Sequence, residues 1–225
     1  MFTRVRHIAF NTEAERQLCR SVFGRFLAPN SIVGCGIEMA PEAEWSGVKA
    51  KYELPDEYVL YLGRVSKAKV DKLLPYFLRC KAKYGGDAKL VLVGGFENEI
   101  RKFDSPDILF TGYVSDEEKT AIVRHATVMV NPSPMESLSL LMLEGMQSRI
   151  PLLVNGRSKV MKDHCRLSGA GLWYNNGRDF RKKLHRLLSD PELRRTMSEK
   201  GPAYVREHYD WEIIIPKLRT LIESI

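Results

Sequence analysis

Short apolar runs that alternate with helical patterns constrain the fold of this chain more than any other feature of its sequence. The runs are three to five residues long and lie at Tyr58–Leu62, Lys89–Val93, Ile108–Phe110, Ala126–Val130, Ile150–Val154 and Gly171–Tyr174. Runs of this kind predict buried strands, and strands that are joined by helices form βαβ units with a parallel sheet. We therefore expect an α/β domain, with a parallel sheet flanked by helices, from about Leu54 to the end of the chain.

The stretches between these runs carry the spacing and the start signals of helices. We expect helices at Lys67–Lys83, near Glu97–Phe103, from Ser115, and from about Leu138. Beyond Tyr174 the pattern is helical throughout. There it divides into Phe180–Leu188, Pro191–Gly201, Ala203–His208 and a last helix from Trp211.

The N-terminal part of the chain is organised differently. Residues 5–10 predict a strand, Glu13 to about Phe26 a helix, and Ser31–Gly34 a second short apolar piece. Residues 38–56 contain acids, prolines and glycine without periodicity, which is typical of a linker. The chain therefore divides, in this interpretation, into residues 1–53 and a domain at 54–225.

Composition and cysteine spacing indicate a globular protein of the cytoplasm. A chain of 225 residues with 44% hydrophobic and 28% charged residues can bury a full core. It has no apolar run long enough to span a membrane, and its N-terminal residues lack the apolar core of a signal peptide. The cysteines have neither metal-ligand nor redox spacing and are expected to be reduced thiols: Cys19, Cys35, Cys80 and Cys165.

The net charge of +7 bears on the choice of partner. The basic residues are dispersed over the expected helix faces, as in residues 178–186, without the aromatic–basic interleaving of single-strand binders. We therefore expect no nucleic-acid partner. The surplus is compatible with an anionic nucleotide donor, and with a glycan or a lipid phosphate at a membrane surface as acceptor.

A proline-broken turn places a carboxylate where α/β proteins bind ligands. After the apolar run that ends at Val130, an Asn-Pro-Ser-Pro sequence interrupts the backbone, and a helical pattern begins at about Leu138. Glu136 thus lies between the carboxyl end of a strand and a helix start, whose free N–H groups attract phosphate. Glu144 is the only charge in the apolar helix that follows. Its carboxylate either faces solvent or has a buried polar partner.

Glu136 and Glu144, with seven residues between them after a strand and a proline break, resemble the signature of retaining glycosyltransferases with the GT-B architecture. This is the branch that includes sucrose and glycogen synthases. Leu138-Ser139-Leu140 stands where the family often has Phe-Gly-Leu. The resemblance covers most of residues 55–225 and, more weakly, residues 5–40, whereas Asn155–Arg166 depart from the family pattern.

Two further segments are similar to family motifs. Gly63-Arg64-Val65 followed by Lys69 is similar to a Gly-Arg-Leu-x-x-x-Lys pattern, with Val70 in place of the usual glycine. Two cations at one strand end can converge on a diphosphate. Gly112-Tyr113-Val114 is similar to a family loop whose main chain faces the nucleotide base.

The resemblance implies a nucleoside diphosphate sugar as substrate, no cofactor and no metal. It implies that Arg64 and Lys69 hold the diphosphate, that Glu144 accepts from the ribose, and that Glu136 is catalytic and faces the sugar. The remaining donor-binding residues are then Gly112, Tyr113, Val114, Leu138, Ser139 and Leu140.

The fold implied is a Rossmann-like domain, the C-terminal half of a GT-B fold. Residues 1–53 would be the C-terminal remnant of an acceptor domain plus the interdomain linker, and residues 54–225 the donor domain. We expect the rest of the acceptor domain to precede Met1, so that this chain alone is inactive as a hexosyltransferase. The alternative is a non-catalytic domain for sugar-nucleotide binding or interaction. A basic nucleic-acid binder is a third interpretation, which would bind oligonucleotides but no nucleoside diphosphates.

Overall fold

The computed structural model describes residues 5–24, 28–97 and 105–224. Within these residues, a six-stranded parallel sheet with strand order β5-β4-β3-β6-β7-β8 forms the main body. Its strands are β3 (Tyr58–Leu62), β4 (Lys89–Val93), β5 (Ile108–Gly112), β6 (Val128–Asn131), β7 (Leu152–Asn155) and β8 (Gly171–Tyr174). Each lies on or beside an apolar run of the sequence, so the predicted parallel α/β sheet is confirmed.

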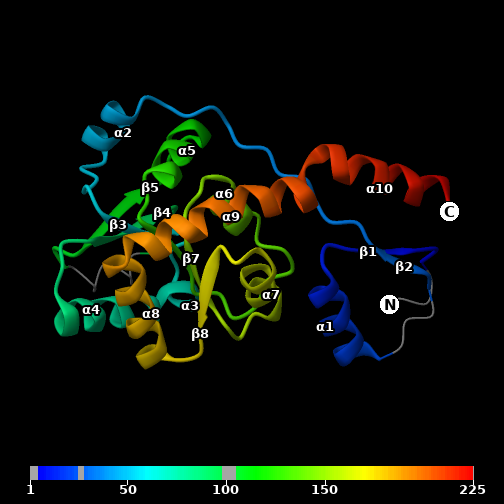
Figure 1. Ribbon diagram of the computed structural model, residues 1–225, viewed down its shortest axis with the longest axis horizontal. Coiled ribbons are helices and arrows are strands. Elements are labelled where there is room, and N and C mark those ends of the chain that lie inside the picture. The colour runs from blue at the N-terminus through cyan, green and yellow to red at the C-terminus, as the bar shows by residue number, and fades with distance from the viewer. Residues whose placement is uncertain (1–4, 25–27, 98–104, 225) are drawn as a thin grey trace.

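The sheet is buried on both faces because residues of its strands alternate between two apolar clusters. In β3, Leu60 packs in one cluster and Val59 in the other, and both are 0% exposed. The first cluster includes residues from helices α5 (Asp116–Arg124), α6 (Leu140–Gln147), α7 (Lys159–Ser168) and α9 (Pro191–Tyr209). The second includes residues from α4 (Leu73–Tyr84) and α8 (Gly177–Ser189). Helices therefore flank the sheet on both sides (Figure 1).

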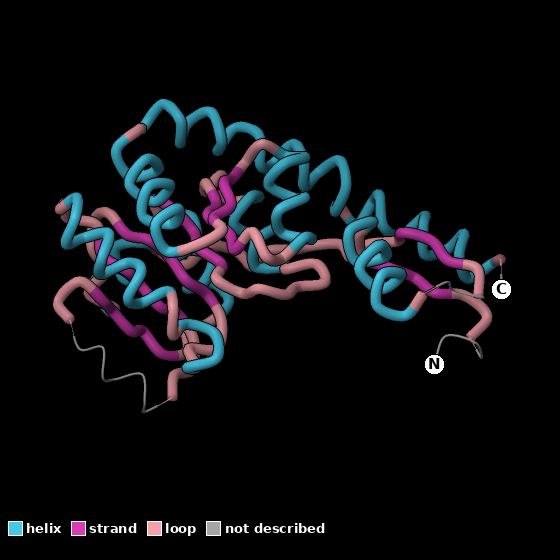
Figure 2. Tube along the Cα trace, turned by 90° about the horizontal axis from the view of Figure 1, so that it is seen from below, coloured by secondary structure: helices cyan, strands magenta, loops and turns pink. Residues whose placement is uncertain are grey.

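A small unit lies beside this body and is formed by β1 (Ile8–Phe10), α1 (Glu13–Phe23) and β2 (Asn30–Ile32). Its two strands pair in parallel, so the strand–helix–strand order predicted for this part is confirmed. We call these three elements the N-terminal unit. The last helix, α10 (Trp211–Glu223), leaves the main body and lies next to the N-terminal unit in both views (Figures 1 and 2).

The chain passes between the N-terminal unit and the main body twice, and the two passages touch. The Ile37 amide donates to the Tyr209 carbonyl over 3.0 Å. Gly36 faces the Trp211 ring so closely that a Cβ there would lie 2.3 Å from a ring carbon. The residue at position 36 must therefore be glycine for the two passages to cross.

The segment that is expected to be a linker, residues 38–56, contains a helix that its sequence does not predict, α2 (Trp45–Lys51). Its start is capped by Glu44, whose carboxylate accepts from two backbone amides. Trp45 stacks on His125 of α5 with ring centroids 3.9 Å apart, and Val48 is buried. The helix thus depends on contacts with a distant part of the chain, which local sequence does not reveal.

The helices differ from the expectation in three other places. The single helix predicted at Lys67–Lys83 is divided into α3 (Lys67–Val70) and α4, because Pro75 cannot extend a helix through Asp71 and is instead accommodated in the first turn of α4. The break predicted near Gly201 is absent, since α9 runs through Pro202. Helix α7 follows β7 in the stretch for which no element was predicted.

The helix expected near Glu97–Phe103 falls almost wholly on residues 98–104, which lie outside the described residues. Among the helices that are described, each is too short or too polar to cross a lipid bilayer.

Candidate functional site

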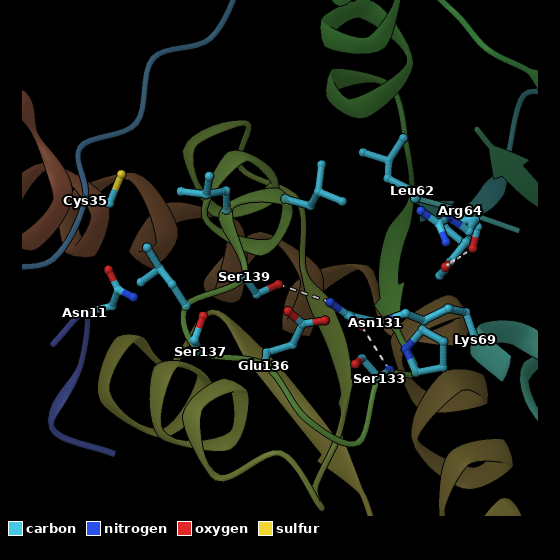
Figure 3. A pocket seen from close by; sticks show the side chains of 16 residues that line it. Asn11, Cys35, Leu62, Arg64, Lys69, Asn131, Ser133, Glu136, Ser137 and Ser139 are labelled. Atoms are coloured by element: carbon cyan, nitrogen blue, oxygen red, sulfur yellow. Dashed lines mark hydrogen bonds between the residues drawn. The ribbon is translucent and has the colours of Figure 1, made fainter. Parts of the chain in front are cut away.

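A cleft of ≈ 450 Å³ opens at the carboxyl ends of β3 and β6, where open α/β sheets bind ligands. It brings together most of the residues that the sequence singled out: Arg64, Lys69, Glu136, Leu138, Ser139 and Leu140. Figure 3 shows Glu136 in the middle of the cleft, with Arg64 and Lys69 on one side and Asn11 and Cys35 of the N-terminal part on the other. Residues far apart in the sequence thus face one space.

The turn after β3 supplies the positive side of the cleft. Gly63 has φ +130° and is approached by Gly94, where a Cβ would lie 2.3 Å from the Gly63 carbonyl oxygen. The Tyr61 hydroxyl donates to the Arg64 carbonyl over 2.9 Å and holds the turn from below. Among the described residues, neither the Arg64 nor the Lys69 side chain forms an ion pair, and both are exposed. Two cations are therefore available to a ligand.

Val70, which stands where the family pattern has glycine, is 0% exposed and packs in the core from the end of α3. Val70 is therefore a packing residue, and its presence in place of glycine leaves the turn at Gly63 intact.

A hydrogen-bonded loop supplies the negative side. The Ser133 amide donates to the Asn131 side-chain oxygen over 3.0 Å, and the Asn131 amide nitrogen donates to the Ser139 hydroxyl over 3.1 Å. The Asn155 side chain donates to the Pro132 carbonyl over 2.9 Å and joins the loop to β7. The loop that carries Glu136 is therefore fixed at both ends and from the side.

The Glu136 carboxylate has no hydrogen bond or ion pair within the part of the chain that the structure describes. Its negative charge affects the pKa of Tyr61. Burial, and next the Glu136 carboxylate, raise the pKa of the Tyr61 phenol to about 12. A half-buried and unpaired carboxylate at the centre of a cleft is available to a bound molecule.

Helix α6 presents its N-terminus to the same cleft. Ser139 is its N-cap residue and adopts the left-handed conformation with φ +68°, and its side chain makes no capping bond. The free amides at this end carry the positive pole of the helix dipole. An anion in the cleft would meet these amides as well as Arg64 and Lys69.

Glu144 pairs with a half-buried cation, so of the two alternatives that its sequence context left open, the structure has the polar partner. The Lys119 ammonium lies 3.1 Å from Glu144 Oε1, and the two side chains are 22% and 12% exposed. Burial by itself would lower the Lys119 pKa, but Glu144 and Asp116 raise it overall. The second carboxylate oxygen, Oε2, is buried and has no hydrogen-bond partner among the described residues, so Glu144 keeps unused acceptor capacity.

The remaining predicted residues lie outside the lining of this cleft. They are Gly112, Tyr113, Val114 and Glu144. The Tyr113 side chain is 87% exposed, and its ring covers Gly95, where a Cβ would lie 2.6 Å from ring atoms. Gly112 and Tyr113 therefore form, with Gly94 and Gly95, a second group of residues at the carboxyl ends of β5 and β4.

Sequence reasoning assigned no role to several residues that shape the cleft. Asn131 and Ser133 lie in the stretch where the prolines predict a chain break, yet their side chains organise the loop. Tyr61 and Lys119 support the site from neighbouring elements. An Asn before Pro-Ser-Pro at a strand end is a signal for Asx-type loop bonding that could have found the first two. Among the described residues, no group of three His, Cys, Asp or Glu side chains could hold a metal ion.

Residues 47–204 match the model of the family "Glycosyl transferases group 1". Alpha-D-kanosaminyltransferase of Streptomyces kanamyceticus is 30% identical over 174 residues, which cover 71% of this chain and 44% of that protein. Glycosyltransferase 1 domain-containing protein 1 of Xenopus tropicalis is 26% identical over 57% of this chain and 36% of that protein. The chain spans less than half the length of these relatives.

Solved structures show the same fold at low sequence identity. A glycosyltransferase from Rickettsia africae matches 97% of this chain and 63% of its own, with a TM-score of 0.82 and 14% identity. The Anabaena protein HepE in complex with UDP and glucose matches 98% of this chain and 64% of its own, with a TM-score of 0.81 and 12% identity.

Proposed function

This chain belongs to the group 1 glycosyltransferases, and we propose that residues 54–225 are the donor-binding domain of a retaining hexosyltransferase. In this proposal the domain binds a nucleoside diphosphate sugar and supports transfer to an acceptor without a metal ion. Residues 1–53 belong to the acceptor side and the connection to it. Because the chain spans less than half of its curated relatives, transfer itself is assigned to a longer protein.

The observation that carries the proposal is the charge arrangement of the cleft. Arg64 and Lys69 stand on one side and the Glu136 carboxylate stands between them and the N-terminal part, and none of the three has an ion-pair partner among the described residues. The start of α6 faces the same space. A diphosphate needs fixed positive charge, and a departing diphosphate needs it most. The two cations and the helix amides supply that charge.

The sugar is then assigned to Glu136. A carboxylate beyond the diphosphate can accept hydrogen bonds from sugar hydroxyls and stabilise positive charge at the anomeric carbon as the diphosphate leaves. This role is supported by the Glu136 carboxylate having no hydrogen-bond or ion-pair partner in the described part of the chain.

The nucleoside is assigned to the space between Tyr113 and Glu144. The exposed Tyr113 ring and the main chain of Gly112–Val114 lie at the carboxyl ends of β5 and β4. The Glu144 Oε2 atom has no hydrogen-bond partner within the described ranges. Ribose hydroxyls are donors that would satisfy it. Because Oε2 is covered in the unliganded chain, a local side-chain shift must accompany ribose binding.

Calorimetric titration of the chain with UDP, GDP and ADP and their sugar derivatives tests the proposal. We expect one nucleoside diphosphate to bind at least tenfold more tightly than its nucleoside, because the diphosphate adds the contacts to Arg64 and Lys69. If every diphosphate binds no better than its nucleoside, the cleft is not a donor site.

A further inference from the structure

A second groove, of ≈ 380 Å³, lies beside the donor cleft. Lys69 and Pro132 line both spaces, so the groove begins where the donor cleft ends. Its other walls come from the residues after α3 and from the turns that follow β7 and β8. None of the residues that recognise the donor in the proposed function, apart from Lys69, belongs to it.

The groove lies at the carboxyl ends of two further strands. Asn155 is the last residue of β7 and Tyr174 the last residue of β8, and both line the groove. The carboxyl ends of parallel strands are where ligands of open α/β sheets bind. The position is therefore that of a ligand site, next to the one already described.

The walls of the groove carry an unneutralised positive charge. Lys69, Lys72 and Arg157 line it, with Asp71 as the acid among the lining residues. Within the described ranges, none of these three cations forms an ion pair. Cations from separate segments that face one space attract an anion, and an Arg beside Lys residues suits the oxygens of a phosphate.

Arg157 is held in place by a bonded turn rather than by a free loop. Its amide donates to the Asn155 side-chain oxygen over 3.1 Å, and the Gly156 amide donates to the Tyr174 carbonyl over 2.8 Å. Gly156 has no room for a side chain, because a Cβ there would lie 2.9 Å from Asn175 Oδ1. Asn155 also bonds to Pro132, so the turn is fixed relative to the donor cleft.

We infer that this groove binds a phosphate monoester, separate from the donor diphosphate. The inference deepens the proposed function, because the phosphate would belong to the acceptor or to a lipid headgroup on which the acceptor is carried. The donor phosphates use Arg64 and the start of α6, whereas the second phosphate uses Lys72 and Arg157. Lys69 stands between the two.

The test uses nuclear magnetic resonance of the labelled chain with glycerol 3-phosphate as the probe, at saturating concentration of the nucleoside diphosphate that binds. With the donor cleft occupied, we expect the amides of Gly156, Arg157 and Asn175 to shift in a saturable manner. The Lys72→Ala/Arg157→Ala double variant should weaken this binding tenfold or more. The charge-matched control is Lys182→Ala/Arg206→Ala, which removes two exposed cations elsewhere and should change it less than twofold.

A parallel measurement uses phosphatidylcholine vesicles that contain phosphatidic acid, whose headgroup is a phosphate monoester. Glycerol 3-phosphate binding that only the groove variant loses assigns the site to a soluble phosphate. Vesicle binding that only the groove variant loses assigns it to a headgroup. If both doubles weaken binding equally, or if neither probe binds once the donor cleft is filled, the inference is wrong. The proposed function fails separately, by the absence of nucleoside diphosphate binding.

Discussion

The Asn131 side chain donates a 3.1 Å hydrogen bond to the hydroxyl of Ser139, a residue held in the left-handed conformation at φ +68°. The bond spans the loop that carries Glu136 and joins the end of β6 to the start of α6. Glycine would adopt this backbone conformation without strain. Serine adopts it with strain, and the hydrogen bond to Asn131, which glycine cannot make, offsets that strain.

Ser139→Ala should therefore destabilise the fold by about 1 kcal/mol, because alanine keeps the backbone strain and loses the hydrogen bond. Ser139→Gly should stay within about 1 kcal/mol of the parent, since relief of strain offsets the lost bond. Urea unfolding measures both. Ser137→Ala, at an exposed position in the same loop, is the control. Equal stability of the parent and Ser139→Ala would show that the bond contributes nothing.

Arg64→Ala should weaken binding of the nucleoside diphosphate tenfold or more and leave the free nucleoside little changed. A charge-assisted hydrogen bond to phosphate is worth about 1.5–3 kcal/mol, and only the diphosphate makes one. Lys67→Ala removes an exposed cation of α3 that does not line the cleft and serves as the control. Calorimetry that finds equal losses for nucleoside and diphosphate would contradict the assignment of Arg64.

Glu144→Gln should lower the affinity for ribonucleotides and narrow their preference over the 2′- and 3′-deoxy analogues. The carboxylate accepts more strongly than a neutral amide, and the deoxy compounds lack the donor. Competition titrations give the ratio of the two affinities. Glu136→Gln should leave that ratio unchanged. If the ratio of ribonucleotide to deoxynucleotide affinity is the same in Glu144→Gln as in the parent, Glu144 does not contact the ribose and serves only as the ion-pair partner of Lys119.

Glu136→Gln should spare binding of the free diphosphate and reduce either the affinity for the sugar donor or the turnover. Binding is measured on this chain, and turnover on the longer protein with its acceptor domain. Wild-type donor binding and turnover in the variant would make Glu136 an ordinary loop residue. Sugar transfer by this chain alone at an enzyme-like rate of about 1–1,000 per second would contradict the need for a further domain.

Acidification should destabilise the fold through His164. This side chain is 2% exposed and its Nδ1 atom lies 2.9 Å from the Tyr204 hydroxyl, and burial lowers its pKa to about 4. Between pH 6.5 and 4 the unfolded chain binds more protons than the folded chain, so stability falls as the pH falls. The loss from this group reaches roughly 3 kcal/mol at pH 4.

The measurement is the free energy of unfolding across this pH window. His164→Asn removes the titrating group, so its stability should fall less steeply with acidification than that of the parent, whatever its stability at pH 7. His185→Asn, at a half-buried position on the other face of the sheet, is the control. A pH slope that His164→Asn shares with the parent would place the acid sensitivity elsewhere.

The main sheet could be predicted from the sequence because both of its faces are buried. Strands such as Leu90–Val93 are then continuous apolar runs, and the helical stretches between them leave few topologies. The helices were less predictable where tertiary contacts decide. Trp45 looks like a residue in a polar linker until His125, eighty residues later, stacks on it.

The unbroken course of α9 has a similar cause. Gly201 and Pro202 predict a helix end, but Gly201 lies against the backbone of Met146, where a Cβ would be 2.5 Å from the carbonyl oxygen. Packing against α6 holds the helix together through the proline. Local propensity cannot report such a contact.

The sequence predicts which residue types line the cleft, but it does not predict the hydrogen bonds that hold them in place. Arg64, Lys69 and Glu136 each follow a strand, and topology alone brings the ends of β3 and β6 together. The bonds that orient the loop join Asn131 to Ser139 and Asn155 to Pro132. They depend on side-chain directions that follow only from the folded backbone.

The crossing of the two passages at Ile37 and Tyr209 also brings both connections of the N-terminal unit to a single place. Helix α1 also packs against α7, so the N-terminal unit is held to the main body both at the crossing and along this pair of helices. Asn11 and Cys35, which face Arg64 across the cleft, are therefore positioned by contacts that lie outside the cleft. A side chain at position 36 would collide with the Trp211 ring and should therefore alter the width of the cleft from a distance.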